Sequence, residues 1–180
     1  MSPVARTEDT AVFAFAVIYF LLVHIRSPRI GHWLPKELAV GVLFAAATAV
    51  PAWSRSSWNA RFSLIPLVVL FAILCWLNCV AIEVWEQRYS QQRELVHTST
   101  HWAGWNFSLL TQATAALAFI LALLSFHHPV AVCCLYLASG MAALLLQWLT
   151  RHRAELTTMQ FRIAVDAALL TPVLFLAWIR

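Results

Sequence analysis

The chain has 180 residues, of which 62% are hydrophobic and only 11% are charged, and its mean hydropathy is +0.75. A soluble domain of this size needs more polar surface, so the composition places the chain in a lipid bilayer. The net charge of +4 comes from short basic loops, which in a membrane protein indicate orientation and argue against a nucleic-acid partner.

Six apolar runs come near the roughly 20 residues that a membrane-spanning helix needs. The second run contains Pro51, which favours a broken or tilted helix, and Pro172 is expected to kink the sixth. The sequence therefore predicts a single all-α, polytopic integral membrane domain over residues 1–180. Its six transmembrane helices are predicted at 8–25, 37–54, 62–84, 104–126, 129–149 and 162–179.

The loops between these helices alternate in their content of Lys and Arg. The first, third and fifth loops hold eight of these residues, whereas the N-terminal tail, the second and fourth loops and the C-terminus hold four. Because cytoplasmic loops carry the excess of Lys and Arg, both termini are predicted to lie outside and the third loop in the cytoplasm. The predicted location is a bacterial inner (plasma) membrane.

Polar residues gather around the end of the third predicted helix. Asn78 lies one to two turns inside that end, and Glu83 and Glu86 follow at the membrane interface, one turn apart. Asp166 enters the sixth helix four residues after Arg162, where an ion pair within the helix would satisfy both side chains. With the predicted topology, all of these residues lie near one membrane face.

Two interpretations of this polar cluster fit the sequence. In the first, Glu83 and Glu86 only mark where the helix leaves the lipid, and Asn78 hydrogen-bonds to a neighbouring helix. In the second, the cluster lines a cytoplasmic-side pocket, where carboxylates hold Mg²⁺ and basic residues take the phosphate charge of a lipid. His97 and His101 are interpreted as solvated loop histidines. No haem is expected, because no histidine lies in the middle of a predicted helix.

Three segments resemble parts of the UbiA-superfamily membrane prenyltransferases. LPKELAVGVLFAAATAVPAW (34–53) is similar to the helix that opens their second half, and FRIAVDAALLTPVL (161–174) to their late helices. LNCVAIEVWE (77–86) lies where those proteins carry their second aspartate-rich motif. The resemblance implies that this all-α chain corresponds to their last six helices, with a prenyl tail in a lateral apolar tunnel and a diphosphate bound through Mg²⁺ on the cytoplasmic side.

The same resemblance implies roles for individual residues. Glu83 and Glu86 would hold Mg²⁺, and no catalytic residue is assigned. The chain departs from the family because its second motif lacks paired aspartates and the first motif has no counterpart. The residues implied for substrate contact are Lys36, Asn78, Arg88 and Arg93.

These observations lead to three hypotheses of function. The first is a UbiA-like membrane protein, a degenerate or partial prenyltransferase, that binds an isoprenoid diphosphate or a related lipid. The alternative is a non-catalytic membrane scaffold or lipid-binding protein, with membrane lipids and a membrane protein or a second copy as partners. A small transporter, in which Asp166 carries a proton, ranks below both.

The charge distribution makes a direct prediction of topology. A tag inserted after Gln92, in the third loop, is expected to lie in the cytoplasm because that loop belongs to the set richer in Lys and Arg. Fusions of green fluorescent protein and of alkaline phosphatase at this position measure it. A fluorescent first fusion and an inactive second one are expected, and the opposite pattern would contradict the predicted orientation.

Overall fold

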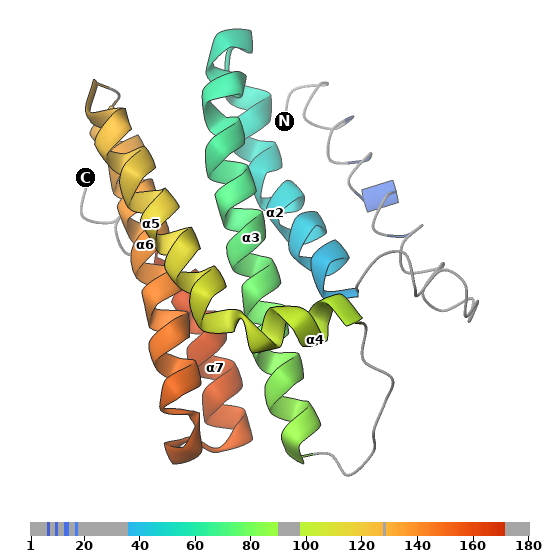
Figure 1. The fold of residues 1–180 in the computed structure, drawn as a ribbon. Coiled ribbons are helices and arrows are strands. Elements are labelled where there is room, and N and C mark those ends of the chain that lie inside the picture. Colours follow the sequence, from blue (N-terminus) through green and yellow to red (C-terminus); the bar gives the residue numbers. More distant parts are fainter. Residues whose placement is uncertain are drawn as a thin grey trace. The chain divides into compact units, whose positions relative to one another are not determined.

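A computed structural model of the chain describes residues 36–89, 98–127 and 129–171, together with the single residues 7, 10, 13, 14 and 17. Every regular element in these ranges is a helix, which confirms the predicted all-α class (Figure 1). The elements are α2 (Lys36–Arg55), α3 (Trp58–Tyr89), α4 (Thr98–Trp105), α5 (Phe107–Leu124), η1 (Ser125–His127), α6 (Val130–Arg151), η2 (Arg153–Glu155) and α7 (Thr158–Leu169).

Four helices in the described part of the chain are long and apolar enough to cross a membrane, and they match the second to fifth predicted helices. The first predicted helix, 8–25, lies almost wholly outside the described residues, as does the sixth beyond residue 171. The membrane class is thus supported by four spans, while the count of six stays a prediction. The four spans are Lys36–Arg55, Arg61–Glu86, Phe107–Leu124 and Val130–Arg151.

Two local expectations are corrected. Of the two alternatives for the second helix, a broken helix does not occur, since α2 continues through Pro51 to Arg55, whereas a tilted helix stays a prediction. The proline lies in the final turns of α2, where few residues follow it. Residues 98–103 were expected in a loop and residue 104 at the start of the fourth helix, but 98–105 form the separate helix α4. Gly104 of α4 lies against α3, because a Cβ atom there would be 2.6 Å from Cγ2 of Val84.

The chain divides into two compact units, Met1–Trp76 and Leu77–Arg180, and α3 runs through the boundary. In the first unit α2 packs closely on α3. A Cβ atom on Gly41 would lie 2.7 Å from the backbone nitrogen of Trp76, so the two backbones approach as closely as small residues allow. The rings of Phe44 and Phe71 lie 6.2 Å apart alongside this contact. The prediction of one domain over the whole chain stays a prediction.

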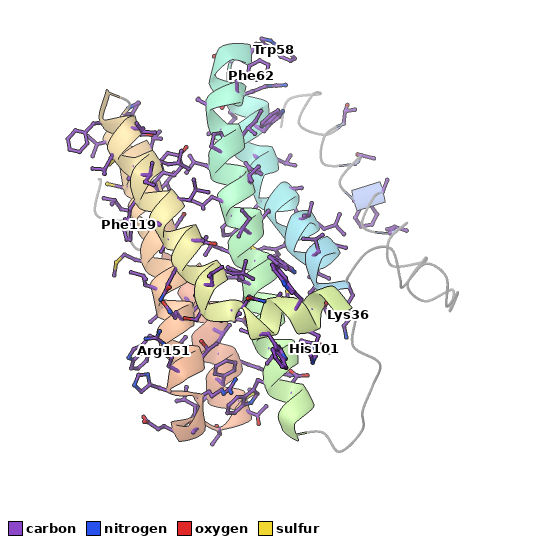
Figure 2. The ribbon with its side chains drawn as sticks, viewed as in Figure 1. Lys36, Trp58, Phe62, His101, Phe119 and Arg151 are labelled. Atoms are coloured by element: carbon purple, nitrogen blue, oxygen red, sulfur yellow. The ribbon has the colours of Figure 1, made fainter. Side chains whose placement is uncertain are left out.

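In the second unit α5 and α6 form an antiparallel hairpin joined by η1. Small buried residues line their contact, and Gly140 lies under the ring of Phe119, whose Cε1 would be 2.9 Å from an added Cβ (Figure 2). In a bilayer the lipid is as apolar as the helices, so no hydrophobic effect drives the helices together. Small side chains favour their association because they let the two backbones pack closely. The buried alanines on the two helices are Ala115, Ala118, Ala122, Ala138, Ala142 and Ala143.

Helix α7 begins at Thr158, four residues before the predicted start, because a capping box fixes its N-terminus. The backbone N–H of Gln160 donates to Oγ1 of Thr157 at 3.3 Å, and the backbone N–H of Thr157 donates to Oε1 of Gln160 at 3.0 Å. The reciprocal bonds satisfy two amide groups that a helix end otherwise leaves unpaired. The earlier start sets Phe161, Val165 and Ala168 on the buried face of α7.

The two close approaches of glycine predict different costs of substitution. Gly41→Ala should lower the free energy of unfolding by about 1–3 kcal/mol, since the new methyl group meets backbone that moves only with the whole helix. Gly140→Ala should cost less, because the ring of Phe119 can rotate away. Unfolding of the purified variants in detergent measures both, with Val42→Ala on the exposed face of α2 as the control. Equal losses for the two glycines would contradict the prediction.

Candidate functional site

Helices α3 and α7 are joined in the second unit by two polar contacts and one aromatic contact. Both Nε and Nη2 of Arg162 donate to Oε1 of Glu86, the first at 2.8 Å. Nδ2 of Asn78 donates to Oδ1 of Asp166 at 3.0 Å. The rings of Trp85 and Phe161 stack with centroids 4.9 Å apart. We call these residues of α3 and α7 the α3–α7 seam.

The spacing of residues in each helix explains why the seam forms. Asn78 precedes Trp85 by seven residues and Glu86 by eight, so the three side chains share one face of α3. On α7, Phe161, Arg162 and Asp166 lie within about one and a half turns of one another. Because the C-terminal part of α3 meets the N-terminal part of α7, each residue finds its partner on the other helix.

The two polar contacts lie at different depths. Asn78 is inside the candidate span Arg61–Glu86 and eight residues before its end, which is about 12 Å along the helix axis. Asp166 lies at the depth of Asn78, since the two side chains are hydrogen-bonded. The contact between Glu86 and Arg162 is at the end of the span, so the seam runs from the membrane edge into the apolar layer.

The ion pair expected within α7 does not form. Arg162 pairs with Glu86 of α3, and Asp166 accepts a hydrogen bond from Asn78. The physical reason is that the neighbouring helix offers each side chain a partner: a carboxylate that the two guanidinium donors reach together, and a buried amide donor. The interpretation of Asn78 as an interhelical hydrogen-bonding residue is confirmed.

Of the other predicted site residues, Glu83 alone has a side chain that the structure describes within the second unit. Glu83 is half-buried on α3, while Lys36 belongs to the first unit, where its Nζ lies 3.9 Å from Oε1 of Glu37. Arg88 lies in the last turn of α3, but its side chain is not among those that the structure describes. Arg93 lies outside the described residues. Across the described ranges, no three His, Cys, Asp or Glu side chains gather to hold a metal ion. The assignments of Mg²⁺ and of substrate contacts stay predictions.

A further polar contact, between α5 and α6, is not predicted by the sequence analysis. Nε2 of Gln147, a residue only 6% exposed, donates to Oγ of Ser108 at 2.7 Å. Nη2 of Arg151 lies 3.5 Å from the same hydroxyl oxygen. The available signal was Gln147 alone in the apolar run of α6, one turn before Arg151. By contrast, Gln112 of α5 is exposed.

The contact between α5 and α6 lies at the same end of the second unit as the α3–α7 seam. The hydrogen bond from Gln147 to Ser108 joins the C-terminal end of α6 to the N-terminal end of α5. Helix α7 starts just beyond α6 (Figure 1). Nε of Arg162 in α7 donates to Glu86, near the C-terminal end of α3. Helix α4 adds Trp102 and Trp105, which are 56% and 83% exposed. Exposed tryptophans of this kind are typical of the membrane–water interface.

The histidines at this end are explained by ring contacts. His101 was interpreted as a loop residue but lies on α4, with its ring 5.6 Å from that of Trp105. His152 ends α6 with its ring 4.6 Å from that of Trp148. Figure 2 labels His101 on α4 and, at the end of α6, Arg151, which directly precedes His152 in the sequence. His97 lies outside the described residues. These contacts suit aromatic packing at an interface.

The described residues thus define an all-helical membrane protein with a polar end on its second unit. Comparison of the chain with protein-family models, with curated proteins and with solved structures gives no match. The resemblance to the UbiA superfamily therefore stays a prediction, and function is argued from the contacts alone.

The contact between Glu86 and Arg162 predicts a measurable coupling. Glu86→Gln and Arg162→Gln should each weaken the α3–α7 seam, and the double variant should lose less than the sum. The coupling energy is expected to be about 0.2–1 kcal/mol, because both side chains are partly exposed. Unfolding in detergent measures the cycle, and the exchanged pair Glu86→Arg with Arg162→Glu should recover part of the loss. Strictly additive losses would show that the pair does not join the helices.

Proposed function

We propose that the protein is a non-catalytic integral membrane protein that binds lipids with anionic headgroups at the polar end of its second unit. One observation carries this proposal: the carboxylate of Glu86, the centre of the predicted metal site, accepts hydrogen bonds from both Nε and Nη2 of Arg162. An acid used in this way holds two helices together. A role in the assembly of other membrane proteins is compatible with the same arrangement.

The charges at this end of the unit favour an anionic lipid. The turn between α6 and α7 carries Arg151, which is exposed, and Arg153, which is half-buried, against the single acid Glu155. Arg and Lys side chains near an anionic leaflet are attracted by about 1 kcal/mol each. The exposed Trp102 and Trp105 of α4 suit the headgroup layer. We place this end at the cytoplasmic face of a bacterial inner membrane with both termini outside, on the basis of the Lys and Arg distribution.

A second candidate function is the Mg²⁺-dependent binding of an isoprenoid diphosphate. Both hydrogen bonds from Arg162 go to Oε1 of Glu86, and no described residue donates to Oε2. That oxygen and the carboxylate of Glu83, one turn away, are the type of ligand that Mg²⁺ prefers. Mg²⁺ held there would bind an isoprenoid diphosphate, as in the UbiA-like hypothesis. The residues proposed to contact it are Lys36, Asn78, Arg88 and Arg93.

The lipid proposal is tested with the purified full chain in detergent micelles. Phosphatidylglycerol should raise the unfolding temperature more than phosphatidylcholine, because only the first lipid carries net negative charge. The difference should shrink at high salt and in Arg151→Gln/Arg153→Gln. Arg55→Gln, at the end of α2 in the first unit, is the matched control and should leave the difference intact. Equal effects of the two lipids, or an equal loss in the control, would rule the proposal out.

The second candidate is separated from the first by a titration with Mg²⁺ and geranylgeranyl diphosphate. A stabilisation that requires both, and that is lost in Glu83→Ala/Glu86→Ala, would favour the diphosphate site. A response that is independent of Mg²⁺ would favour the non-catalytic function. In cells, Glu86→Gln should then still complement a deletion, because a glutamine can keep a hydrogen bond to Arg162 but is a poor Mg²⁺ ligand.

A further inference from the structure

The side chain of Asn78 combines burial with an unused hydrogen-bond acceptor. The residue is 6% exposed, and its Nδ2 donates to Oδ1 of Asp166 at 3.0 Å. Its Oδ1 is buried and has no hydrogen-bond partner. A buried carbonyl oxygen almost always has a partner, so an unpaired one calls for a physical explanation. The donor it needs should come from the group beside it.

We infer that Asn78 and Asp166 form a proton-binding site within the membrane, with the proton on Oδ2 of Asp166. An ionised carboxylate can only accept hydrogen bonds, whereas a protonated one gains an O–H donor. That O–H can donate to Oδ1 of Asn78 while Nδ2 of Asn78 donates to Oδ1 of Asp166. The acid and the amide then form a closed ring with two hydrogen bonds. One proton supplies the missing donor and removes a negative charge from the apolar layer.

The depth of the pair supports a neutral acid. Asn78 lies about 12 Å inside the end of the span Arg61–Glu86, and Asp166, which is exposed on the surface of the described part of the chain, is held beside it at the same depth. An ionised side chain in the hydrocarbon region is unfavourable unless a charge of opposite sign or water compensates it. Among the described residues, Asn78 is the only hydrogen-bond partner of Asp166. A single neutral amide does not balance a full charge.

The charged groups on neighbouring elements leave Asp166 without an ion pair among the described residues. Arg162 lies one turn from Asp166 on α7, and its Nε and Nη2 donate to Glu86 of α3, so these two charges balance each other. Glu83 lies on α3 five residues after Asn78. Helix α5 has no titratable side chain. The titratable residues of α6 are Cys133, Cys134, Tyr136 and Arg151, which lie in its first two turns and at its last residue.

Protonation of Asp166 would also affect the packing of α3 against α7. The pair is one of the two polar contacts of the α3–α7 seam, and it is the contact inside the apolar layer. Loss of the proton would leave one hydrogen bond in place of two and a negative charge in the seam. This inference does not depend on which lipid the protein binds, because it concerns the seam and not the basic turn between α6 and α7.

Infrared spectroscopy of the purified full chain in lipid nanodiscs tests the proton directly. At neutral pH we expect a C=O stretching band of a protonated carboxylic acid, which Asp166→Asn removes and Asn78→Leu shifts. Glu86→Gln is the matched control, because that acid is ion-paired and should not contribute to the band. Absence of a protonated-acid band that depends on Asp166 would overturn the inference, as would a band that Glu86→Gln removes.

Stability provides a second measurement. Asp166→Asn keeps a neutral group with one donor and one acceptor facing Asn78, so its unfolding midpoint should equal that of the original chain. Asp166→Leu, which has a similar size but no hydrogen-bonding group, should unfold at a lower temperature. If Asp166→Asn were destabilised as much as Asp166→Leu, the charge itself would be the stabilising feature, and the proton would not be part of the native state.

Discussion

The α3–α7 seam is the constraint on which the polar end of the second unit depends. Apolar attraction gives little selectivity between helices in a bilayer, since lipid chains are as apolar as the side chains they replace. The stack of Trp85 on Phe161 and the two polar contacts of the seam supply that selectivity. A shift of α7 by one turn would part Asn78 from Asp166 and leave both polar groups unpaired within the membrane.

The same contacts change how the acidic residues at the membrane edge are interpreted. A carboxylate at a membrane edge is compatible with a metal ligand, a helix end or an interhelical contact, and its partner decides among them. The partner of Glu86 is a guanidinium on a helix 76 residues away in the sequence. Gln147 and Ser108 make a corresponding contact between α5 and α6. The polar residues at this end of the unit therefore act first as links between helices, and any ligand must bind around those links.

Much of the helical pattern follows from the sequence, whereas the contacts between helices do not. Long apolar runs are sufficient to identify α2, α3, α5 and α6, because a spanning segment must be apolar along most of its length. The start of α7 was missed because the capping box at Thr157 and Gln160 is a local hydrogen-bond pattern that hydropathy does not detect. The expected pairing of Arg162 with Asp166 was wrong because spacing in the sequence identifies possible partners on the same helix but not partners on another helix.

The polar end holds two kinds of contact, which differ in whether water can solvate their polar groups when the contact opens. The pair of Glu86 and Arg162 is partly exposed at the end of the span, where water and headgroups compensate each charge if the pair opens. The pair of Asn78 and Asp166 lies deeper, where an opened contact has no such compensation. Opening of the seam should therefore begin at Glu86 and stop at Asn78. The deeper pair sets the register of the two helices, and the outer pair is the part of the seam that a headgroup or an ion can reach.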